Sequence, residues 1–249
     1  ILKNAPEGII QFEIGVQSTN ENTISAIGRS IEFEDVKENV EKILALGNIH
    51  IHLDLIAGLP YEGYDSFKKS FDDVVSIRPH VLQLGFLKLL KGSRIREQEK
   101  IFGYRYKEKA PYEIMENNCI SFDEIIRLKH VEEVFKRYYN SGDFKRCMDY
   151  LFEKYPSPFG VFEKIYDYYL ENNLFDRAVS LEDLCLGAVA EEVCTEGLQL
   201  RIDTCLIELG IGILGDGVGI RLPIIGPAVL LHIEGSSDPV THLHSGKAL

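Results

Sequence analysis

The chain has few cysteines, and they are far apart. Its 249 residues include five, which are Cys119, Cys147, Cys185, Cys194 and Cys205. This spacing does not resemble a disulfide framework, so we expect a reducing, cytoplasmic location. No two of them stand at the close spacing typical of metal-binding cysteines. The sequence therefore predicts no metal site within this chain.

Long apolar runs and dense basic runs are also missing. No stretch of about 20 residues is free of charge, so we expect no transmembrane helix and no membrane partner. The net charge is −12 without a Lys/Arg cluster, which argues against nucleic acid as the main partner. The first residues, ILKN, include neither an initiator Met nor a signal-peptide pattern. We therefore expect the chain to begin inside a longer protein.

Aromatic residues disappear from the last third of the chain. The 12 Tyr and 13 Phe residues all lie at or before Phe175, and the residues after it include 10 of the 21 Gly. Such a shift in composition indicates a boundary. We expect three parts: later βα units of a barrel over residues 1–105, a helical extension over 106–180, and an aromatic-free tail over 181–249. The tail is predicted to be either disordered or foreign to the native protein.

Strand and helix patterns alternate in the first part. Residues 12–18, 49–56 and 81–87 are short, apolar and bounded by turn formers, as strands are. Residues 34–46 and the stripe from Phe67 to Val75 have helical spacing between those strands. Alternation of this kind predicts parallel strands with right-handed crossovers. The expected fold class is α/β, with the later strands of a partial TIM-like (β/α) barrel followed by a mainly helical extension.

The two faces of the predicted strands differ in chemistry. Because side chains alternate along a strand, each face collects every second residue. One face is apolar: Phe12, Ile14, Val16, Ile49, Ile51, Leu53, Leu55, Leu82, Leu84 and Phe86. The other is polar or small: Glu13, Gly15, Gln17, His50, His52, Asp54, Gln83 and Gly85. A lumen that holds a polar ligand fits this pattern, and the alternative is a set of polar groups that satisfy one another or ordered water.

The second part reads as helices. Ser121 and Glu124 form a capping-box pattern that opens a helix running to about Tyr139. Asn140, Ser141 and Gly142 supply the stop of this helix. Further helices are predicted over residues 144–154 and 161–171.

Three segments in this order resemble the radical S-adenosylmethionine (SAM) superfamily. They are FEIGVQS at residues 12–18 with Arg29 after it, HLDLIAGLP at residues 52–60, and RPHVLQLGF at residues 78–86. The similarity is nearest to members related to oxygen-independent coproporphyrinogen oxidase and to cobalamin-binding-domain proteins. Residues 110–113 and 139–142 resemble an uncharacterised C-terminal extension in some of the latter.

The resemblance implies roles for single residues. Gln17 and Ser18 would contact the ribose or amino-acid part of SAM, Arg29 its carboxylate, and Asp54 its ribose. Arginine suits a carboxylate because it offers planar, charged donors. Adenine would lie beside the backbone from Gly85 to Lys88, and Gly58 would make a turn next to the same ligand. The residues expected to face substrate are Glu13, His50, His52 and Gln83.

The resemblance also implies what this chain does not carry. The family holds a [4Fe–4S] cluster with CxxxCxxC, a spacing that none of the five cysteines has. The cluster ligands, and any cobalamin, would therefore belong to segments outside this chain. We expect a portion of a radical SAM enzyme that is inactive by itself and acts on an unknown substrate. The alternatives are a non-catalytic fragment with at most weak SAM binding, and a TIM-like enzyme of unrelated chemistry.

Other tempting patterns carry less weight. His50 and His52 share one strand face about 7 Å apart, and we favour polar lining over metal ligation for them. The GxGxxG string at residues 210–215 precedes Pro223 rather than a helix, which argues against a nucleotide site. His242 and His244 lie in a terminal segment where disorder is the simpler expectation.

Overall fold

The computed structural model describes residues 2–30, 32–180, 183–184, 187, 219–220 and 231–232. In chain order the elements are η1 (Leu2–Asn4), β1 (Ile10–Gln17), α1 (Glu21–Ala26), α2 (Phe33–Leu44), β2 (Ile49–Ala57), α3 (Tyr64–Ser76), β3 (Val81–Phe86), α4 (Arg94–Glu97), α5 (Glu99–Phe102), β4 (Arg105–Tyr106), β5 (Ile114–Glu116), α6 (Phe122–Phe135), η2 (Lys136–Asn140), α7 (Lys145–Lys154), α8 (Pro158–Glu171), β6 (Gly219–Ile220) and β7 (Leu231–His232). The predictions on Cys185, Cys194, Cys205, residues 210–215 and the two terminal histidines lie outside the described residues.

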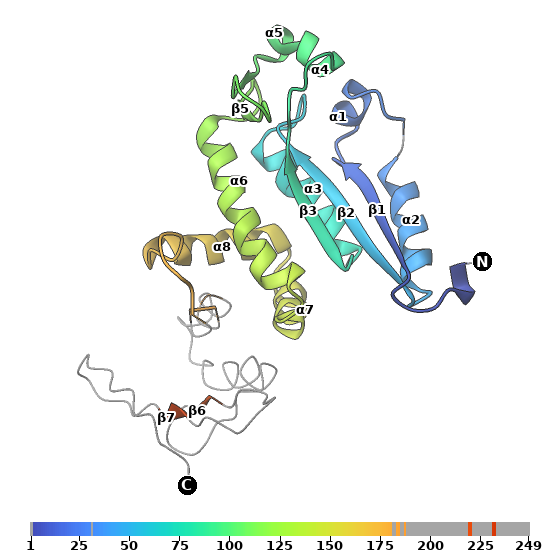
Figure 1. Ribbon diagram of the computed structural model, residues 1–249, viewed down its shortest axis with the longest axis vertical. Coiled ribbons are helices and arrows are strands. Elements are labelled where there is room, and N and C mark those ends of the chain that lie inside the picture. The colour runs from blue at the N-terminus through green and yellow to red at the C-terminus, as the bar shows by residue number, and fades with distance from the viewer. Residues whose placement is uncertain are drawn as a thin grey trace.

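A parallel sheet in the order β1-β2-β3 forms the first part of the molecule (Figure 1). The helix α2 connects β1 to β2, and α3 connects β2 to β3. The predicted α/β unit of parallel strands is thus confirmed. Closure of these strands into a barrel stays a prediction.

The apolar face of the sheet is the buried one. Ile51, Leu53 and Leu55 of β2 have no exposed surface. α3 covers this face with Phe67 and Phe71, which are also fully buried, and its stripe ends at Ser76 before Pro79. Proline disfavours a helical residue before it, which accounts for the stop. Burial of one face leaves the polar set on the other.

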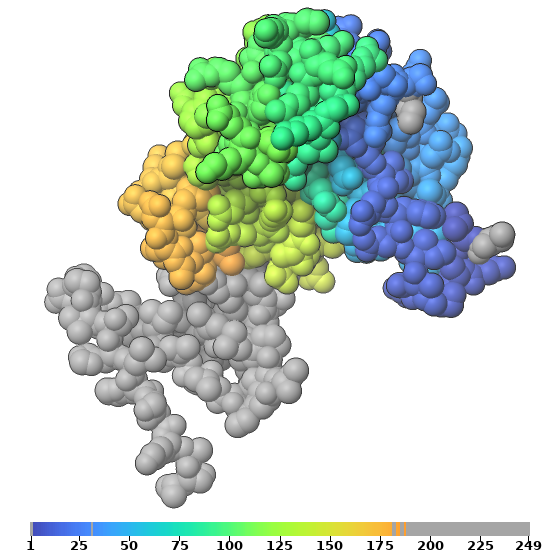
Figure 2. Space-filling view, turned by 45° about the horizontal axis from the view of Figure 1, so that its top comes forward, coloured from blue at the N-terminus to red at the C-terminus, as the bar shows by residue number. Residues whose placement is uncertain are grey.

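The extension joins the βα units through aromatic side chains. Phe71 of α3 makes edge-to-face contacts with Phe135, Phe159 and Phe162, with ring centroids 5.1 to 5.9 Å apart. Such pairs add to the free energy gained from burial alone. The two parts pack as one continuous body in Figure 2. The aromatic residues that are concentrated before Phe175 therefore build the contact between the two parts.

The helix α6 begins as predicted and ends earlier. Ser121 and Glu124 form the expected capping box, in which each side chain bonds the other's backbone N–H. α6 ends at Phe135, and the π-helical turn η2 continues to Asn140. This turn places Asn140 against the outer edge of β3. There its side-chain amide accepts from the Leu82 N–H at 3.1 Å and donates to the Leu82 carbonyl at 2.9 Å.

The extension therefore covers the outer edge of β3. Besides the Asn140 amide, the Tyr139 hydroxyl donates to the Pro79 carbonyl at 2.6 Å. Beyond the strand, the Ile114 N–H donates to the Leu87 carbonyl at 2.8 Å. Figure 1 shows α6, α7 and α8 beyond β3, on the side away from β1. This edge of the sheet is occupied by the protein's own side chains and loops.

Several short elements were not predicted from the sequence. These are α1, α4, α5 and the antiparallel β4–β5 pair. Segments of two to six residues are too short to show a helical or strand period. In the part of the chain that the structure describes, no helix is long and apolar enough to cross a membrane.

Candidate functional site

The polar face carries a row of small and polar residues near the carboxyl ends of the strands. Gly15 of β1 lies opposite Asp54 of β2, which lies opposite Gln83 of β3. One position nearer the start of the sheet on this face, Glu13 lies opposite His52. In parallel α/β architectures, ligands bind at the carboxyl ends of strands. The row through Asp54 is therefore the place to look for a site.

Gln17 turns its side chain back over this face. The register of β1 shifts between Gly15 and Gln17, and Gln17 adopts a left-handed backbone with φ of 72°. A non-glycine residue in this region costs about 1–2 kcal/mol. A Cβ on Gly15 would lie only 2.0 Å from the Gln17 Nε2 atom. Gly15 therefore leaves the space that the Gln17 amide occupies.

Arg29 reaches the same spot from the loop after α1. Its Nη1 donates to the Gly15 carbonyl at 2.6 Å. Its Nη2 would lie 3.6 Å from a Cβ on Gly15. The side chain is exposed and makes no ion pair within the described residues. A free guanidinium at this place suits an incoming carboxylate.

Two oxygen atoms of this group lack a partner. Gln17 Oε1 and Asp54 Oδ1 are buried and accept no hydrogen bond from any described residue. Burial raises the pKa of Asp54, Glu13 raises it further, and His52 opposes the shift. An unsatisfied buried acceptor costs about 1–3 kcal/mol. We call Gly15, Gln17, Arg29 and Asp54 the strand-end group, and its unpaired oxygens indicate a ligand that donates hydrogen bonds.

The other polar residues of this face are instead paired with one another. The Gln11 Nε2 donates to Glu13 at 3.2 Å, and it lies 3.4 Å from the His52 Nδ1. The Gln83 Nε2 lies 3.5 Å from the same nitrogen. Because an amide nitrogen is a donor, the His52 Nδ1 is the acceptor of these two contacts. These residues satisfy much of their own hydrogen-bonding capacity.

Two further histidines complete this set. The rings of His50 and His80 stack with centroids 4.5 Å apart, and His50 also contacts His52 at 4.9 Å. Burial is the main cause that lowers the pKa of both His50 and His80. The His80 Nδ1 accepts from the Ile51 N–H at 3.1 Å, so it is not free to bind a metal. We call the whole set the imidazole network: Gln11, Glu13, His50, His52, His80 and Gln83.

Four expected contact residues lie apart from the strand-end group. Ser18 is buried on the helix side of the sheet, where it bonds Glu62. Gly58 has φ of 88°, as a turn glycine does, and a Cβ there would meet Ile114 at 2.5 Å. At Gly85 a Cβ would find ordinary contacts of 3.5 Å or more, so the backbone does not require glycine. The Lys88 side chain is exposed.

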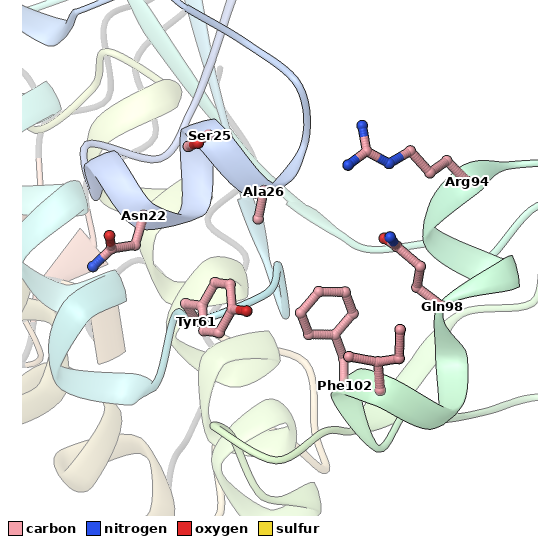
Figure 3. Close-up of a pocket in the computed structure, with 8 residues that line it drawn as sticks. Asn22, Ser25, Ala26, Tyr61, Arg94, Gln98 and Phe102 are labelled. Carbon is pink, nitrogen blue, oxygen red and sulfur yellow. The ribbon is translucent and has the colours of Figure 1, made fainter.

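An open cleft of about 620 Å³ lies beyond the strand ends (Figure 3). The residues that line it come from α1, the loop after β2, α4 and α5: Asn22, Ser25, Ala26, Tyr61, Arg94, Gln98, Ile101 and Phe102. The rings of Tyr61 and Phe102 meet edge to face with centroids 5.5 Å apart. Sequence patterns gave no sign of this cleft, because α4 and α5 are too short to be predicted.

The residues that could hold metal are sparse. Among the described residues, no group of His, Cys, Asp and Glu could hold a metal ion. Cys119 is exposed and Cys147 is half-buried, and both lie in the extension. The donor set near the strand ends therefore does not fit an iron–sulfur cluster. It does fit a ligand with a carboxylate and several hydroxyl or ammonium donors.

Parts of the chain are similar to one protein family and to two coproporphyrinogen III oxidases. The family described as "Protein of unknown function (DUF4080)" matches residues 100–186, which begin in α5 and take in the extension. The chain is 36% identical over 73 residues to "Coproporphyrinogen III oxidase, anaerobic 1" of Cereibacter sphaeroides (strain ATCC 17023). It is 33% identical over 73 residues to "Oxygen-independent coproporphyrinogen III oxidase" of C. sphaeroides (strain ATCC 17025). Each match covers 29% of this chain and 16% of the relative.

One solved structure, the archaeal Methanocaldococcus infernus Elp3 with an N-terminal deletion, aligns with a TM-score of 0.35 and 21% identity. That alignment covers 38% of this chain and 22% of the other. The chain thus spans only a small part of the relatives that it matches. The sequence similarity supports a relationship to radical SAM enzymes, and cobalamin binding has no support from these matches.

Proposed function

We propose that this chain is a portion of a radical SAM enzyme and that its strand-end group holds SAM. Arg29 would bind the SAM carboxylate, Gln17 the ribose or amino-acid part, and Asp54 the ribose. The unpaired oxygens of Gln17 and Asp54 carry this proposal, because SAM offers hydroxyl and ammonium donors for them. The guanidinium of Arg29, which has no ion-pair partner among the described residues, adds the matching charge.

The residues of this chain bind and orient rather than transfer electrons. The described cysteines do not fit a [4Fe–4S] cluster, so such a cluster would be held outside this chain and would supply the electron for the cleavage of SAM. Glu13, His50, His52 and Gln83 lie on the same face and would meet the substrate beside SAM.

Isothermal titration of the full chain with SAM tests this function. The wild-type protein should give saturable heat. Asp54→Asn should weaken binding about tenfold or more, because a hydrogen bond to a charged group contributes about 1.5–3 kcal/mol. The matched control is Asp143→Asn, which alters an exposed aspartate in the loop after η2 and should leave the affinity unchanged. Absence of saturable heat from the wild-type chain at millimolar SAM would overturn the proposal.

A further inference from the structure

Glu62 is a buried acid that has no part in the function proposed above. It follows the turn at residues 58–60, and its side chain has no exposed surface. Its Oε1 accepts from the Ser18 hydroxyl at 2.6 Å and from the Ser70 hydroxyl at 2.8 Å. Its Oε2 is buried without a partner among the described residues. A carboxyl group placed in a core in this way calls for a specific explanation.

The contacts of Glu62 tie the loop after β1 to α3. The Ser18 Oγ, besides donating to Glu62, accepts from the Asn20 N–H at 2.9 Å. The Ser70 Oγ accepts from the Thr19 N–H at 3.0 Å. The backbone N–H groups of Thr19 and Asn20 are thus bound by two serine hydroxyls. Both hydroxyls in turn donate to the same oxygen of Glu62. Glu62 therefore sets where the backbone directly after Gln17 lies.

Gln17 depends on that backbone. Its left-handed conformation is one that a side chain larger than glycine adopts only when neighbouring contacts impose it. The conformation turns the Gln17 amide over Gly15, next to Arg29. Before Gln17 in the chain, the register shift in β1 constrains its backbone. After it, the hydrogen bond from Ser18 to Glu62 does so. Contacts on both sides thus hold one strained residue of the strand-end group.

We infer that Glu62 is a positioning residue for this site: by accepting from Ser18 and Ser70 it holds Gln17 in the conformation that presents its amide to SAM. This inference rests on the function proposed above. The role requires an acceptor oxygen at Glu62 rather than its charge. Glutamine keeps that oxygen, and alanine does not.

Variants of the full chain test the inference through SAM titration. Glu62→Ala should weaken SAM binding about tenfold. Ser18→Ala should do the same, because it removes the hydroxyl that joins Glu62 to the backbone after Gln17. Glu62→Gln should restore the affinity to within about twofold of the wild type. Glu171→Ala serves as the control, because it removes an exposed glutamate at the end of α8. A merely structural role would lower the melting temperature in Glu62→Ala but leave the affinity of a folded Ser18→Ala protein intact.

A second readout keeps this inference separate from SAM binding. The side-chain amide of Gln17 gives a pair of NMR resonances that Gln17→Ala identifies by their loss. These resonances should shift in Ser18→Ala and Glu62→Ala and stay in place in Glu62→Gln, with no SAM present. Unchanged resonances in a folded Ser18→Ala protein would overturn the positioning role, even if SAM binds. Shifted resonances in a chain that does not bind SAM would uphold the positioning of Gln17 and reject only the ligand.

Discussion

The strand-end group and the imidazole network share one face of one sheet, yet they differ in how their polar atoms are satisfied. In the imidazole network, two glutamine amides share one nitrogen of His52, and His50 stacks on His80. In the strand-end group, two buried oxygens have no partner and one guanidinium has no anion among the residues that the structure describes. The first arrangement is close to complete without a ligand. The second is not, and so the difference separates polar residues that satisfy one another from polar residues that await SAM.

The largest expected effect concerns the support beneath the strand-end group. Burial raises the pKa of Glu62 to about 7, and the bonds from Ser18 and Ser70 oppose that shift. Because the folded pKa exceeds the unfolded one, the folded state holds a proton that the unfolded state has lost. The contribution to stability is full below about pH 4.5 and is lost as pH rises to about 7, on the order of 3 kcal/mol in total. Above pH 7 no further loss from this group is expected.

Urea denaturation at pH 5 and pH 8 measures this effect. The wild-type protein should lose more stability over that interval than Glu62→Gln, which has no proton to release. Equal losses in the two proteins would show that Glu62 titrates normally in the folded state. Other groups titrate in both proteins, so the difference between them isolates Glu62.

A second prediction concerns the unpaired oxygen of Asp54 in the strand-end group. If Asp54 awaits a ligand, its unpaired oxygen destabilises the protein when SAM is absent. Asp54→Leu should therefore raise the free energy of unfolding by about 1–2 kcal/mol while it removes SAM binding. Urea denaturation without SAM measures this change. A lower free energy of unfolding would mean that Asp54 already has a stabilising partner.

A third prediction concerns the space over Gly15. A Cβ there would displace the far end of the Gln17 side chain, which can move aside at little energetic cost. Gly15→Ala should thus weaken SAM binding about tenfold, equivalent to about 1.4 kcal/mol, and change the free energy of unfolding by less than about 0.5 kcal/mol. The control is Gly160→Ala in α8, where a Cβ would meet the Ser157 side chain at 3.4 Å or more. Equal affinities in these two variants would remove Gln17 from the site.

The smallest effect is expected in the imidazole network. His52→Ala removes two long contacts of 3.4 and 3.5 Å, so it should lower the free energy of unfolding by less than about 1 kcal/mol. SAM affinity should stay within about twofold, because His52 lies one position below the row through Asp54. A tenfold loss of affinity would erase the distinction between the two regions.

The alternation of strand and helix patterns along the chain predicted the parallel sheet, and the alternating chemistry within the strands predicted its polar face. The period of two along His50, His52 and Asp54 is visible in the sequence, and burial of Ile51, Leu53 and Leu55 confirms it. The capping box at Ser121 was equally visible, because both partners lie within four residues. The strand faces and the capping box could thus be predicted because each depends on residues that are close together in the sequence.

Other features depend on contacts between distant residues. No local pattern marks the left-handed backbone of Gln17, which arises from a register shift against β2. Glu62 lies 44 residues from Ser18, and nothing in the residues around it indicates burial. Arg29 entered the predicted site only through the resemblance to a family. Its contact with Gly15 follows from how the loop after α1 folds back.

The side-chain amide of Asn140 has a consequence for how this sheet can grow. A primary amide offers one donor and one acceptor in the same plane, as a peptide group does, and so it occupies Leu82 as a neighbouring strand would. Exposed strand edges are templates for pairing with other chains. Asn140 thus blocks the outer edge of β3. Any strand that pairs with this edge must first displace the Asn140 side chain. The Asn140→Ala protein, with this edge uncovered, should show a new tendency to associate.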